Sequence, residues 1–461
     1  MRIFTQDIIK HEGKEVELAG WVHARRDHGK LIFIDLRDRS GTAQVILTSK
    51  ISGATDLRLE YLVRIKGTVQ KRPPAMVNDK IPTGYHEISA TSLEILNAAG
   101  AMPISVDTDG LEIHEEARLT YRYLDLRRER LRKNLEFRHK ATKFIRDFLS
   151  AKDFIEVETP ILTKSTPEGA RDYLVPSRLY NGKFYALPQS PQQYKQLLMV
   201  GGLEKYFQIA RCFRDEDTRG DRQPEFTQLD LEMSFVERED VMKLTEELLI
   251  ALVKTCAPEK EIQDIPFPRI TYREAIEEHK TDRPDIRKDK NNPNLLAFCW
   301  VIDFPFFEKS DKGGWTFTHN PFSAPKPEFM DDLLAGKNIP DILTTQYDIV
   351  LNGYEVGGGS IRNHKPDALK AVFKIMGFNE ERIQANFGHM LEALSYGAPP
   401  HGGIAPGIDR LVMILRNEPN IREVIAFPKT GDAVDPMMKS PSEVDKEQLN
   451  ELGLEIKKNK K

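Results

Sequence analysis

The sequence predicts an α+β protein that begins with a small β-barrel and continues as a larger part in which helices and strands mix. Five short apolar or alternating runs, separated by turn residues, fill about the first 100 residues, as in a small barrel. Beyond residue 105, apolar residues take helical spacing at Leu131, Leu135, Ile145 and Phe148, and strand-like pieces then mix with helices. A chain of 461 residues, 40% hydrophobic and 30% charged, is long enough for two or three such domains.

The expected barrel strands are the runs 16–23, 31–36, 43–47, 62–69 and 86–95. Inside the second run, Phe33 lies among cations and an amide, notably Arg25 and Gln44. An unstacked RNA base can lie on an aromatic ring while an amide or guanidinium binds its edge. Taken alone this indication is weak, because a phenylalanine in an apolar strand is more often a core residue.

Basic residues are concentrated in the stretch 118–146. The whole chain has 67 Lys and Arg against 71 acidic residues, a net charge of −4, which does not indicate a nucleic-acid-binding protein. The stretch itself holds eleven Lys or Arg and three acidic residues. Two interpretations stay open: a solvated helix face, or contact with phosphates, which needs clustered cations and no particular sequence.

Composition argues against a membrane protein and against a disulfide-rich one. No apolar run approaches the roughly 20 residues that cross a bilayer, and the first ten residues lack the apolar stretch of a signal peptide. We therefore expect a cytoplasmic protein with no membrane segment. Cys212, Cys256 and Cys299 lie far apart without a CxxC pair, so neither a disulfide framework nor a cysteine-rich zinc site is expected.

The segments 207–217 and 222–232 alternate charged residues with β-prone apolar ones. A strand, a loop and a second strand of this kind would present Arg214 to a phosphate, with Glu216 nearby to hold a donor or a metal-bound water. An arginine in such a motif can also be a structural ion pair.

Two further segments repeat this chemistry. In 402–412, glycines precede an apolar helix with Arg410 on its first turn, and a glycine run separates Glu355 from Arg362. Glycines permit close backbone approach, and a guanidinium fork matches phosphate oxygens. Three such elements in one chain favour phosphate binding over three unrelated ion pairs.

On these motifs the chain resembles the class II aminoacyl-tRNA synthetases, and within them the bacterial-type aspartyl-tRNA synthetases, over nearly its whole length. The three motifs of that class resemble FIEVETPIL at 154–162, FRDE at 213–216 with PEF at 224–226, and GIDR at 407–410. The longer strings specific to the aspartyl group are PEGARD at 167–172, LPQSPQ at 187–192 and YGAPPHGG at 396–403. GWV at 20–22 and LIFIDLRD at 31–38 match the anticodon domain of the family.

The resemblance implies an N-terminal OB-fold barrel joined to a catalytic domain built on a largely antiparallel sheet flanked by helices. The expected parts are an anticodon-binding domain at 1–104, a hinge and basic linker at 105–135, a class II catalytic domain at 136–445 and a tail at 446–461. Motif 1 around Pro160 would form a homodimer interface. The large inserted domain usual in bacterial-type enzymes is expected to be missing, because only 258–297 fill its place.

The implied reaction has two steps. Aspartate and ATP form aspartyl-adenylate, and the aspartyl group then passes to the 3′ end of tRNA(Asp). His28 indicates that tRNA(Asn) is a second acceptor. Because the attacking carboxylate is already ionised, the first step needs positioning and charge neutralisation more than a general base.

The resemblance also assigns site residues. Those expected to act in catalysis are Arg214, Glu216 and Arg410. The expected aspartate-binding residues are Glu168, Ser190, Gln192, Lys195, Arg214, Asp230, His319 and Arg362. The expected ATP-binding residues are Arg214, Asp215, Glu216, Gln223, Phe226, Glu355, Gly407, Ile408, Asp409 and Arg410. Asp348 and Glu355 would hold Mg²⁺, whose preference for hard oxygen ligands they meet, and the expected anticodon-binding residues are Arg25, His28, Phe33 and Gln44.

Selection of aspartate follows from the charges of this set. Arg362 and Lys195 would face the side-chain carboxylate, while Asp230 and Glu168 would attract the ammonium group. Asparagine would leave a buried cation underpaired, and rejection through unsatisfied polar groups can reach roughly 10⁴-fold. Aspartate is therefore favoured over asparagine.

Two residues qualify the resemblance. Asn320 stands where the family often has a second histidine, which affects a secondary substrate contact. His28, in the loop of the anticodon domain, resembles members that charge both tRNA(Asp) and tRNA(Asn), whereas strict members tend to have an apolar residue there. A loop histidine that is merely solvated is the alternative.

Three other functions stay open. An asparaginyl-tRNA synthetase is the nearest, and Lys195 with its flanking string argues against it. A non-catalytic RNA-binding paralogue should have lost part of the arginine and glutamate set, which is complete here. A ligase that joins aspartate to a small amine would need neither the barrel nor the basic linker.

Overall fold

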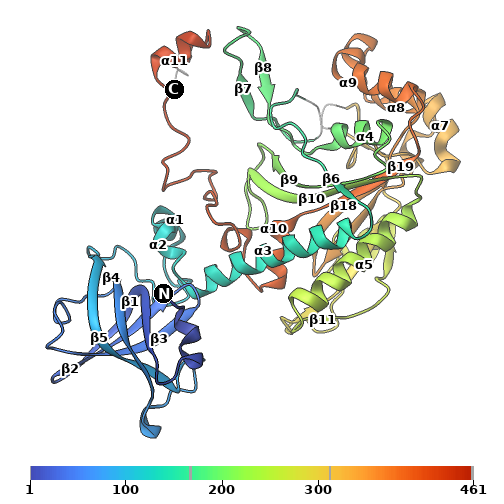
Figure 1. The fold of residues 1–461 in the computed structure, drawn as a ribbon. Helices are drawn as coiled ribbons and strands as arrows, with labels where there is room; N and C mark the ends of the chain where they lie inside the picture. Colours follow the sequence, from blue (N-terminus) through green and yellow to red (C-terminus); the bar gives the residue numbers. More distant parts are fainter. Residues whose placement is uncertain (1, 166–168, 311–312, 458–461) are drawn as a thin grey trace. The chain divides into compact units, whose positions relative to one another are not determined.

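The computed structural model describes residues 2–165, 169–310 and 313–457 (Figure 1). The chain divides into two compact units, of which the first ends at Arg130 and the second begins at Leu131. Among the helices of these described ranges, none is both long and apolar enough to cross a membrane.

The first unit is built on a closed five-stranded barrel, as predicted. Its strand order is β1-β2-β3-β5-β4, and all pairs are antiparallel except β3 with β5. The strands are β1 (Glu15–His28), β2 (Leu31–Asp38), β3 (Gly41–Thr48), β4 (Leu62–Lys71) and β5 (His86–Asn97). Along β2 the buried side chains Ile32, Ile34 and Leu36 alternate with Phe33 and Asp35, which are partly exposed. Phe33 therefore lies on the outer face of the barrel and not in its core.

The short elements of this unit are the helical turns η1 (Thr5–Lys10) and η2 (Pro74–Met76) and the helices α1 (Glu115–Thr120) and α2 (Arg122–Asp125). They include the start of the basic stretch, much of which is internally paired. The carboxylate of Asp125, fully buried, accepts hydrogen bonds from Arg122 at 2.7 Å and from Arg128 at 2.6 Å. Arg127 pairs with Glu60 at 2.7 Å. These arginines therefore stabilise the fold, which neither interpretation of the basic stretch anticipated.

The second unit is built on an eight-stranded sheet of order β12-β14-β17-β18-β19-β10-β9-β6. The sheet is antiparallel apart from the two edge pairs, β12 with β14 and β6 with β9. Its strands are β6 (Ile155–Glu156), β9 (Lys205–Phe213), β10 (Glu225–Ser234), β12 (Arg269–Thr271), β14 (Phe298–Ile302), β17 (Tyr347–Leu351), β18 (Tyr354–Ile361) and β19 (His401–Pro406). The largely antiparallel sheet expected from the resemblance is confirmed.

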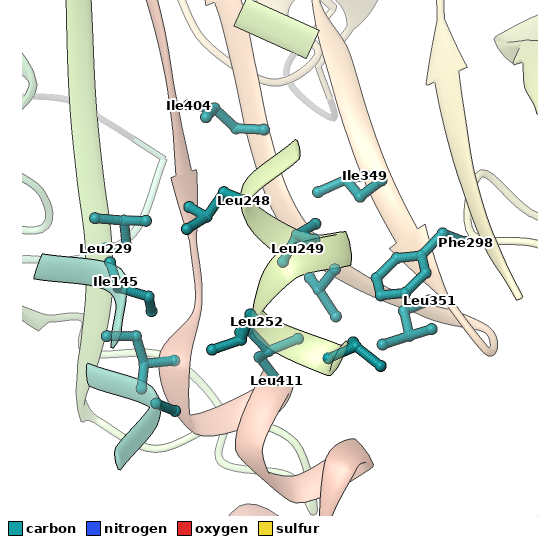
Figure 2. Packing of buried hydrophobic residues seen from close by; sticks show 14 of the residues in the cluster. Ile145, Leu229, Leu248, Leu249, Leu252, Phe298, Ile349, Leu351, Ile404 and Leu411 are labelled. Carbon is teal, nitrogen blue, oxygen red and sulfur yellow. The ribbon is translucent and has the colours of Figure 1, made fainter. Parts of the chain in front are cut away.

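One face of this sheet carries the main hydrophobic core. Three helices supply the opposing side chains: α3 (Glu129–Ser150), α5 (Arg238–Cys256) and α10 (Ile408–Leu415). Figure 2 shows Leu248, Leu249 and Leu252 of α5 lying against Leu229 and Ile349 of the sheet. Because side chains alternate along a strand, the residues between these core positions point to the opposite face. In β10, Leu229 and Leu231 belong to the core, so Gln228, Asp230 and Glu232 lie on the opposite face.

The segment 258–297 packs onto the second unit, called the catalytic unit below, instead of forming a domain of its own. It contributes β12 to the edge of the large sheet and pairs β11 (Glu261–Ile262) with β13 (Leu295–Leu296). Between these strands lie α6 (Tyr272–Glu274) and the π-helical turn η3 (Ala275–His279).

The remaining elements of the second unit lie outside the large sheet. The strands are β7 (Leu174–Pro176), β8 (Phe184–Ala186), β15 (Phe307–Lys309) and β16 (Trp315–Phe317). The helices are α4 (Gln192–Val200), α7 (Met330–Ala335), α8 (Pro366–Ile375), α9 (Glu380–Ser395) and α11 (Lys446–Glu451), with short turns η4 (Pro327–Phe329), η5 (Ile339–Asp341) and η6 (Ile421–Glu423).

Candidate active site

Two adjoining cavities lie over the face of the sheet that points away from the main core. The larger has a volume of about 320 Å³ and the smaller about 180 Å³. Arg214, Glu216 and Glu355 line both cavities. A ligand in one cavity and a ligand in the other can therefore meet at these three side chains.

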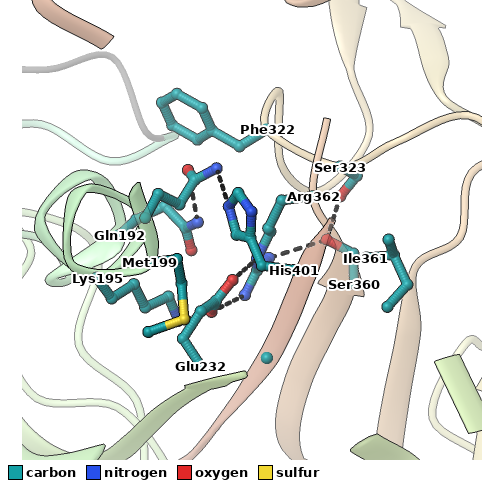
Figure 3. A network of polar contacts seen from close by, with 12 residues as sticks. Gln192, Lys195, Met199, Glu232, Phe322, Ser323, Ser360, Ile361, Arg362 and His401 are labelled. Carbon is teal, nitrogen blue, oxygen red and sulfur yellow. Dashed lines mark hydrogen bonds and ion pairs between the residues drawn. The ribbon is translucent and has the colours of Figure 1, made fainter. Parts of the chain in front are cut away.

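Four buried charges make up the floor of the larger cavity: Lys195, Asp230 and Arg362 line it, and Glu232 pairs with both cations. Figure 3 shows Lys195, Arg362 and Glu232. Lys195 lies 2.9 Å from Asp230 and 3.3 Å from Glu232, measured from Nζ to carboxylate oxygens. Arg362 holds Glu232 with two parallel hydrogen bonds of 2.9 and 3.1 Å. Each of the four residues is at most 2% exposed. Folding has thus already removed two cations and two anions from water, so a ligand does not have to supply that free energy.

The charged floor has unused hydrogen-bonding capacity. Arg362 donates three hydrogen bonds to Glu232 and Ser360, whereas its guanidinium carries five N–H groups. The Oδ1 atom of Asp230 is buried without a hydrogen bond to the described residues. A ligand that brings both a carboxylate and an ammonium group would satisfy both.

The charges also set one another's protonation. Burial raises the pKa of Asp230, and the nearby Lys195 only partly offsets this. Burial alone would also raise the pKa of Glu232, but Arg362 and Lys195 outweigh it, so the pKa is lowered. Glu232 is therefore the ionised brace of Arg362.

Glycines in β18 and β19 keep this space free of side-chain atoms. A Cβ atom at Gly403 would lie 2.2 Å from Oε2 of Glu232, and one at Gly358 would lie 2.9 Å from Oδ1 of Asp348. Both contacts are too short for real Cβ atoms. The glycines of β18 and β19 thus leave the two carboxylates room on the cavity face.

The smaller cavity is lined by arginines and an aromatic ring. The guanidinium of Arg214 lies 5.0 Å from the ring centroid of Phe226. Arg410, on the first turn of α10, donates to the backbone oxygen of Glu355 and lies 3.2 Å from the Asp221 carboxylate. Flat aromatic and cationic surfaces of this kind suit a purine and phosphates.

Asp348 and Glu355 both line the larger cavity, where they form a pair of hard oxygen donors. Asp348 accepts from Gln346 at 2.7 Å and lies 3.2 Å from His319. Burial would lower the pKa of His319, but Asp348 and Glu355 raise it to about 9. Within the described residues no group of three metal-ligating side chains occurs. Two carboxylates fit Mg²⁺ when phosphates and waters complete its shell.

Most of the predicted catalytic-unit residues line the two cavities. Around the larger one lie the expected aspartate-binding residues Ser190, Gln192, Lys195, Arg214, Asp230, His319 and Arg362, together with Asp348. Around the smaller one lie the expected ATP-binding residues Arg214, Glu216, Gln223, Phe226, Glu355, Gly407, Asp409 and Arg410. Glu168 lies outside the described residues. Asn320, the departure from the family pattern, also lines the larger cavity.

Three expected ATP-binding residues have other partners. Ile408 is buried in the main core, and the Asp215 carboxylate lies 3.5 Å from Arg171, so neither lines a cavity. Asp409 accepts from the backbone N–H of Thr227 at 2.7 Å and pairs with Arg138, which ties α10 to β10 and α3.

The four expected anticodon-binding residues lie on the first three barrel strands. The ring of His28 meets Phe33 edge-on with centroids 5.5 Å apart. Gln44 donates to Glu87 at 2.8 Å and accepts from Arg26 at 3.3 Å. Arg25 is held by Asp27 at 3.1 Å and by the backbone oxygen of Leu57. An outward aromatic ring beside polar edges matches what an unstacked base requires.

Three residues near the larger cavity were missed: Glu232, Gln196 and His401. Glu232 follows Asp230 by two positions, so the period of a strand already placed both carboxylates on one face. Gln196 and His401 carried no such signal, because they act beneath the cavity surface and 205 positions apart.

Comparison with known proteins accounts for both units. The family model described as tRNA synthetases class II (D, K and N) matches residues 114–431, and the OB-fold nucleic acid binding domain matches residues 16–96. The chain belongs to the class II tRNA synthetases. The family and fold resemblances stated from the motifs are confirmed.

Curated relatives cover the chain almost completely. The aspartate–tRNA(Asp/Asn) ligase of Dehalococcoides mccartyi strain CBDB1 is 41% identical, covering 97% of this chain and 98% of the relative. The ligase of the same name from Rubrobacter xylanophilus is 43% identical, covering 96% and 95%. The first alignment spans 587 positions, whereas this chain has 461 residues, so the relative carries more than about 100 aligned residues that this synthetase lacks.

Solved structures share the fold at lower identity. The asparaginyl-tRNA synthetase of Pyrococcus horikoshii, solved with asparaginyl-adenylate, has a TM-score of 0.75 at 24% identity, covering 93% of this chain and 98% of that one. The aspartyl-tRNA synthetase of Entamoeba histolytica has a TM-score of 0.72 at 22% identity, covering 93% and 91%.

Proposed function

We propose that this synthetase is an aspartate–tRNA ligase that forms aspartyl-adenylate from aspartate and ATP and charges tRNA(Asp) and also tRNA(Asn). Relatives more than 40% identical over nearly the whole chain carry the name aspartate–tRNA(Asp/Asn) ligase. The assignment of aspartate as the substrate rests on the buried floor of the larger cavity, which consists of Lys195, Arg362, Asp230 and Glu232. It offers an anionic side chain two cations and offers an ammonium group an open carboxylate oxygen.

The residues of the two cavities take separate parts of the reaction. Arg362, braced by Glu232, uses its remaining N–H groups for the side-chain carboxylate of aspartate, while Asp230 accepts from the ammonium group. Arg214 lies between the cavities, where the α-carboxylate and the α-phosphate meet, and it neutralises charge there as the new bond forms. Phe226 stacks on adenine and Arg410 binds the distal phosphates of ATP, which is the expected second substrate of class II synthetases.

Asp348 and Glu355 belong to the same proposal as the residues that hold Mg²⁺. The ion would neutralise phosphate charge when bound. Glu168, Asp215 and Ile408 remain sequence-based assignments within this proposal.

A homodimer through the segment 154–162 is proposed as well. Its side chains Ile155, Ile161 and Leu162 are 50%, 40% and 54% exposed, although they are large and apolar. A second copy of the chain would cover them. Because tRNA, ATP and aspartate are used together in protein synthesis, we assign the protein to the cytoplasm.

In the barrel, Arg25, His28, Phe33 and Gln44 are proposed to bind the anticodon. Phe33 lies on the outer face of the barrel with the exposed His28 beside it, so their ring surfaces are open to a single-stranded loop. Gln44 is buried and bonds to Glu87 and Arg26, so a base would have to share its amide with these partners. The exposed His28 ring supports the relaxed choice between the two tRNAs.

The test is aminoacylation with labelled aspartate and, in parallel, labelled asparagine, using tRNA(Asp) and tRNA(Asn) transcripts with ATP and Mg²⁺. Charging of both transcripts with aspartate alone is expected. Charging with asparagine would indicate an asparaginyl enzyme, and aspartyl-adenylate formation without charging of either tRNA would indicate a different acceptor, such as a small amine. Absence of both reactions would indicate a non-catalytic RNA-binding paralogue.

A further inference from the structure

Beneath the larger cavity runs a chain of hydrogen bonds whose direction is fixed at one end (Figure 3). It leads from the Pro399 carbonyl through His401 and Gln196 to Gln192, and of these only Gln192 lines the cavity. Figure 3 labels His401 and Gln192. Gln196 and His401 are fully buried. The chain therefore connects a backbone carbonyl to a group that a ligand can touch.

The direction is set at His401. Its Nδ1 atom lies 2.8 Å from the carbonyl oxygen of Pro399, and because a carbonyl only accepts, Nδ1 must carry a proton. Burial lowers the pKa of His401 and outweighs the opposing effects of Glu232 and of the hydrogen bond to Pro399, while Arg362 and His364 act in the same sense as burial. A neutral ring with its proton on Nδ1 leaves Nε2 as an acceptor.

His401 in turn sets the donor and acceptor roles of two glutamines in α4. The Nε2 atom of Gln196 lies 3.2 Å from Nε2 of His401 and must donate to it. The Oε1 atom of Gln196 consequently faces Gln192, whose Nε2 donates to it at 3.0 Å, one helical turn away. If the Gln196 amide turned over, its oxygen would face the lone pair of His401 and two buried acceptors would be left unsatisfied.

We infer that His401 and Gln196 are positioning residues that hold the Gln192 amide with its oxygen toward the cavity, to accept from the ammonium group of the substrate. This inference rests on the proposed function. Among the described residues no hydrogen bond reaches Oε1 of Gln192, and Oδ1 of Asp230 is a second carbonyl-type acceptor that lines the cavity without a hydrogen bond. An ammonium group brings three donors, so it can use both. With the amide reversed, its NH₂ group would meet the ammonium donor to donor.

Prolines strengthen the fixed end of the chain. Pro399 and Pro400 restrict the backbone before His401, and the Pro400 oxygen is held by the N–H of Phe235 at 2.7 Å. The carbonyl that orients the ring therefore has little freedom to turn. This gives the string PPH at 399–401 a physical role in the site.

The test compares aspartate with succinate, which keeps both carboxylates of aspartate and lacks its ammonium group. In Gln196→Met, a change of similar volume, the KM for aspartate in ATP–pyrophosphate exchange is expected to rise about tenfold, with kcat and the KM for ATP nearly unchanged. Inhibition by succinate should stay within about twofold of the wild type, because no ammonium is there to lose its acceptor. The matched control is Gln193→Met, which removes the neighbouring buried amide that bonds to His389 at 2.7 Å and should leave both constants unchanged.

A second variant tests the direction itself. In Gln196→Glu the carboxylate still accepts from Gln192, and His401 can take a second proton to donate to it. The KM for aspartate should then stay within about threefold of the wild type, although the change introduces a charge. Methionine at this position would thus be more harmful than glutamate.

Three results would overturn the inference. An equal weakening of aspartate and succinate in Gln196→Met would indicate a purely structural role, and an unchanged KM for aspartate would show that the chain does not orient Gln192. Equal defects in the methionine and glutamate variants would contradict the fixed direction. A wild-type protein without aspartate-dependent exchange would instead overturn the proposed function, and the inference with it.

Discussion

The outer face of β2 in the barrel and the cavity face of β10 in the catalytic unit both carry charged side chains, but at opposite depths. Asp35 of β2 pairs with Arg26 at 2.9 Å, and the two side chains are 26% and 47% exposed. Asp230 and Glu232 of β10 pair with cations at similar distances, yet none of these side chains is more than 2% exposed. The outer face of β2 thus leaves this ion pair partly in water, whereas the cavity face of β10 has fixed its charges in advance.

The energetic consequence differs by an order of magnitude. An exposed pair is worth roughly 0–1 kcal/mol and is weakened by salt. Removing one partner of a buried pair costs about 3–5 kcal/mol, because the remaining charge stays buried without compensation. Changes on the cavity face should therefore be severe and should act on adenylate formation, while changes on the barrel should be milder and act on tRNA.

The largest effect is expected for Glu232→Gln. The neutral amide cannot neutralise Arg362 and Lys195, so the cavity floor gains an uncompensated cation. The kcat/KM for aspartate in ATP–pyrophosphate exchange should fall about 100- to 1,000-fold. Glu278→Gln, an exposed glutamate of the π-helical turn, is the control and should be neutral. A decrease of less than threefold in Glu232→Gln would show that Glu232 is not the brace of Arg362.

A smaller effect confined to tRNA is expected for Phe33→Ala. Loss of the outward ring removes a stacking surface worth about 1–3 kcal/mol per base, so the KM for tRNA(Asp) should rise about 30-fold. Adenylate formation should not change, because Phe33 belongs to the barrel. Phe4→Ala, which removes another partly exposed aromatic ring of the first unit, is the control. Equal loss in both variants would argue for general damage to the barrel.

The barrel was predictable from sequence because its information is local. Buried residues alternate with less buried ones along most of β1, β2 and β4, so these runs and the faces of their side chains follow from a period of two. In β3 the alternation breaks at Ala43, Gln44 and Val45, which are all buried. Even Phe33, which composition alone assigned to the core, lies between Ile32 and Ile34 and was bound to face outward once those two faced inward.

The catalytic site was predictable only in part because its pairs are distant in sequence. Arg362 meets Glu232 across 130 positions and Gln196 meets His401 across 205. The resemblance supplied residues that line the two cavities, such as Lys195, but motifs do not distinguish a cavity-lining residue from one that packs beside it. Ile408 lies within motif 3 and yet fills the core.

Lys260 is a buried cation that bonds to no carboxylate among the described residues, so it shows what burial alone does to a charge. Its ammonium donates to the oxygens of Pro293 at 2.8 Å and Asn417 at 2.6 Å, both neutral, and burial lowers its pKa to about 8. Above pH 8 the folded protein loses this proton, while the unfolded chain keeps it until about pH 10.5. The unfolded state then binds more protons, so the stability contribution of Lys260 rises with pH across this window.

The measurement compares the wild type with Lys260→Met by urea unfolding between pH 7.5 and 10. The free energy of unfolding of the wild type, relative to the variant, should increase by about 1–2 kcal/mol over that range. Placing both proteins in a Trp21→Phe background leaves Trp300 and Trp315, which report on the catalytic unit. A difference that stays constant with pH would show that Lys260 is not desolvated.

The smallest effect is expected for His28→Leu, which tests the relaxed choice of tRNA. Leucine keeps an apolar contact with Phe33 but has no ring nitrogen to bond to a base, so charging of tRNA(Asn) should fall about fivefold relative to tRNA(Asp). The KM for aspartate should not change. His28→Gln keeps a polar group at this position and should retain more tRNA(Asn) charging than leucine does. If leucine reduced charging of both tRNAs equally, His28 would contribute to the binding of any tRNA by the barrel and would not select between anticodons.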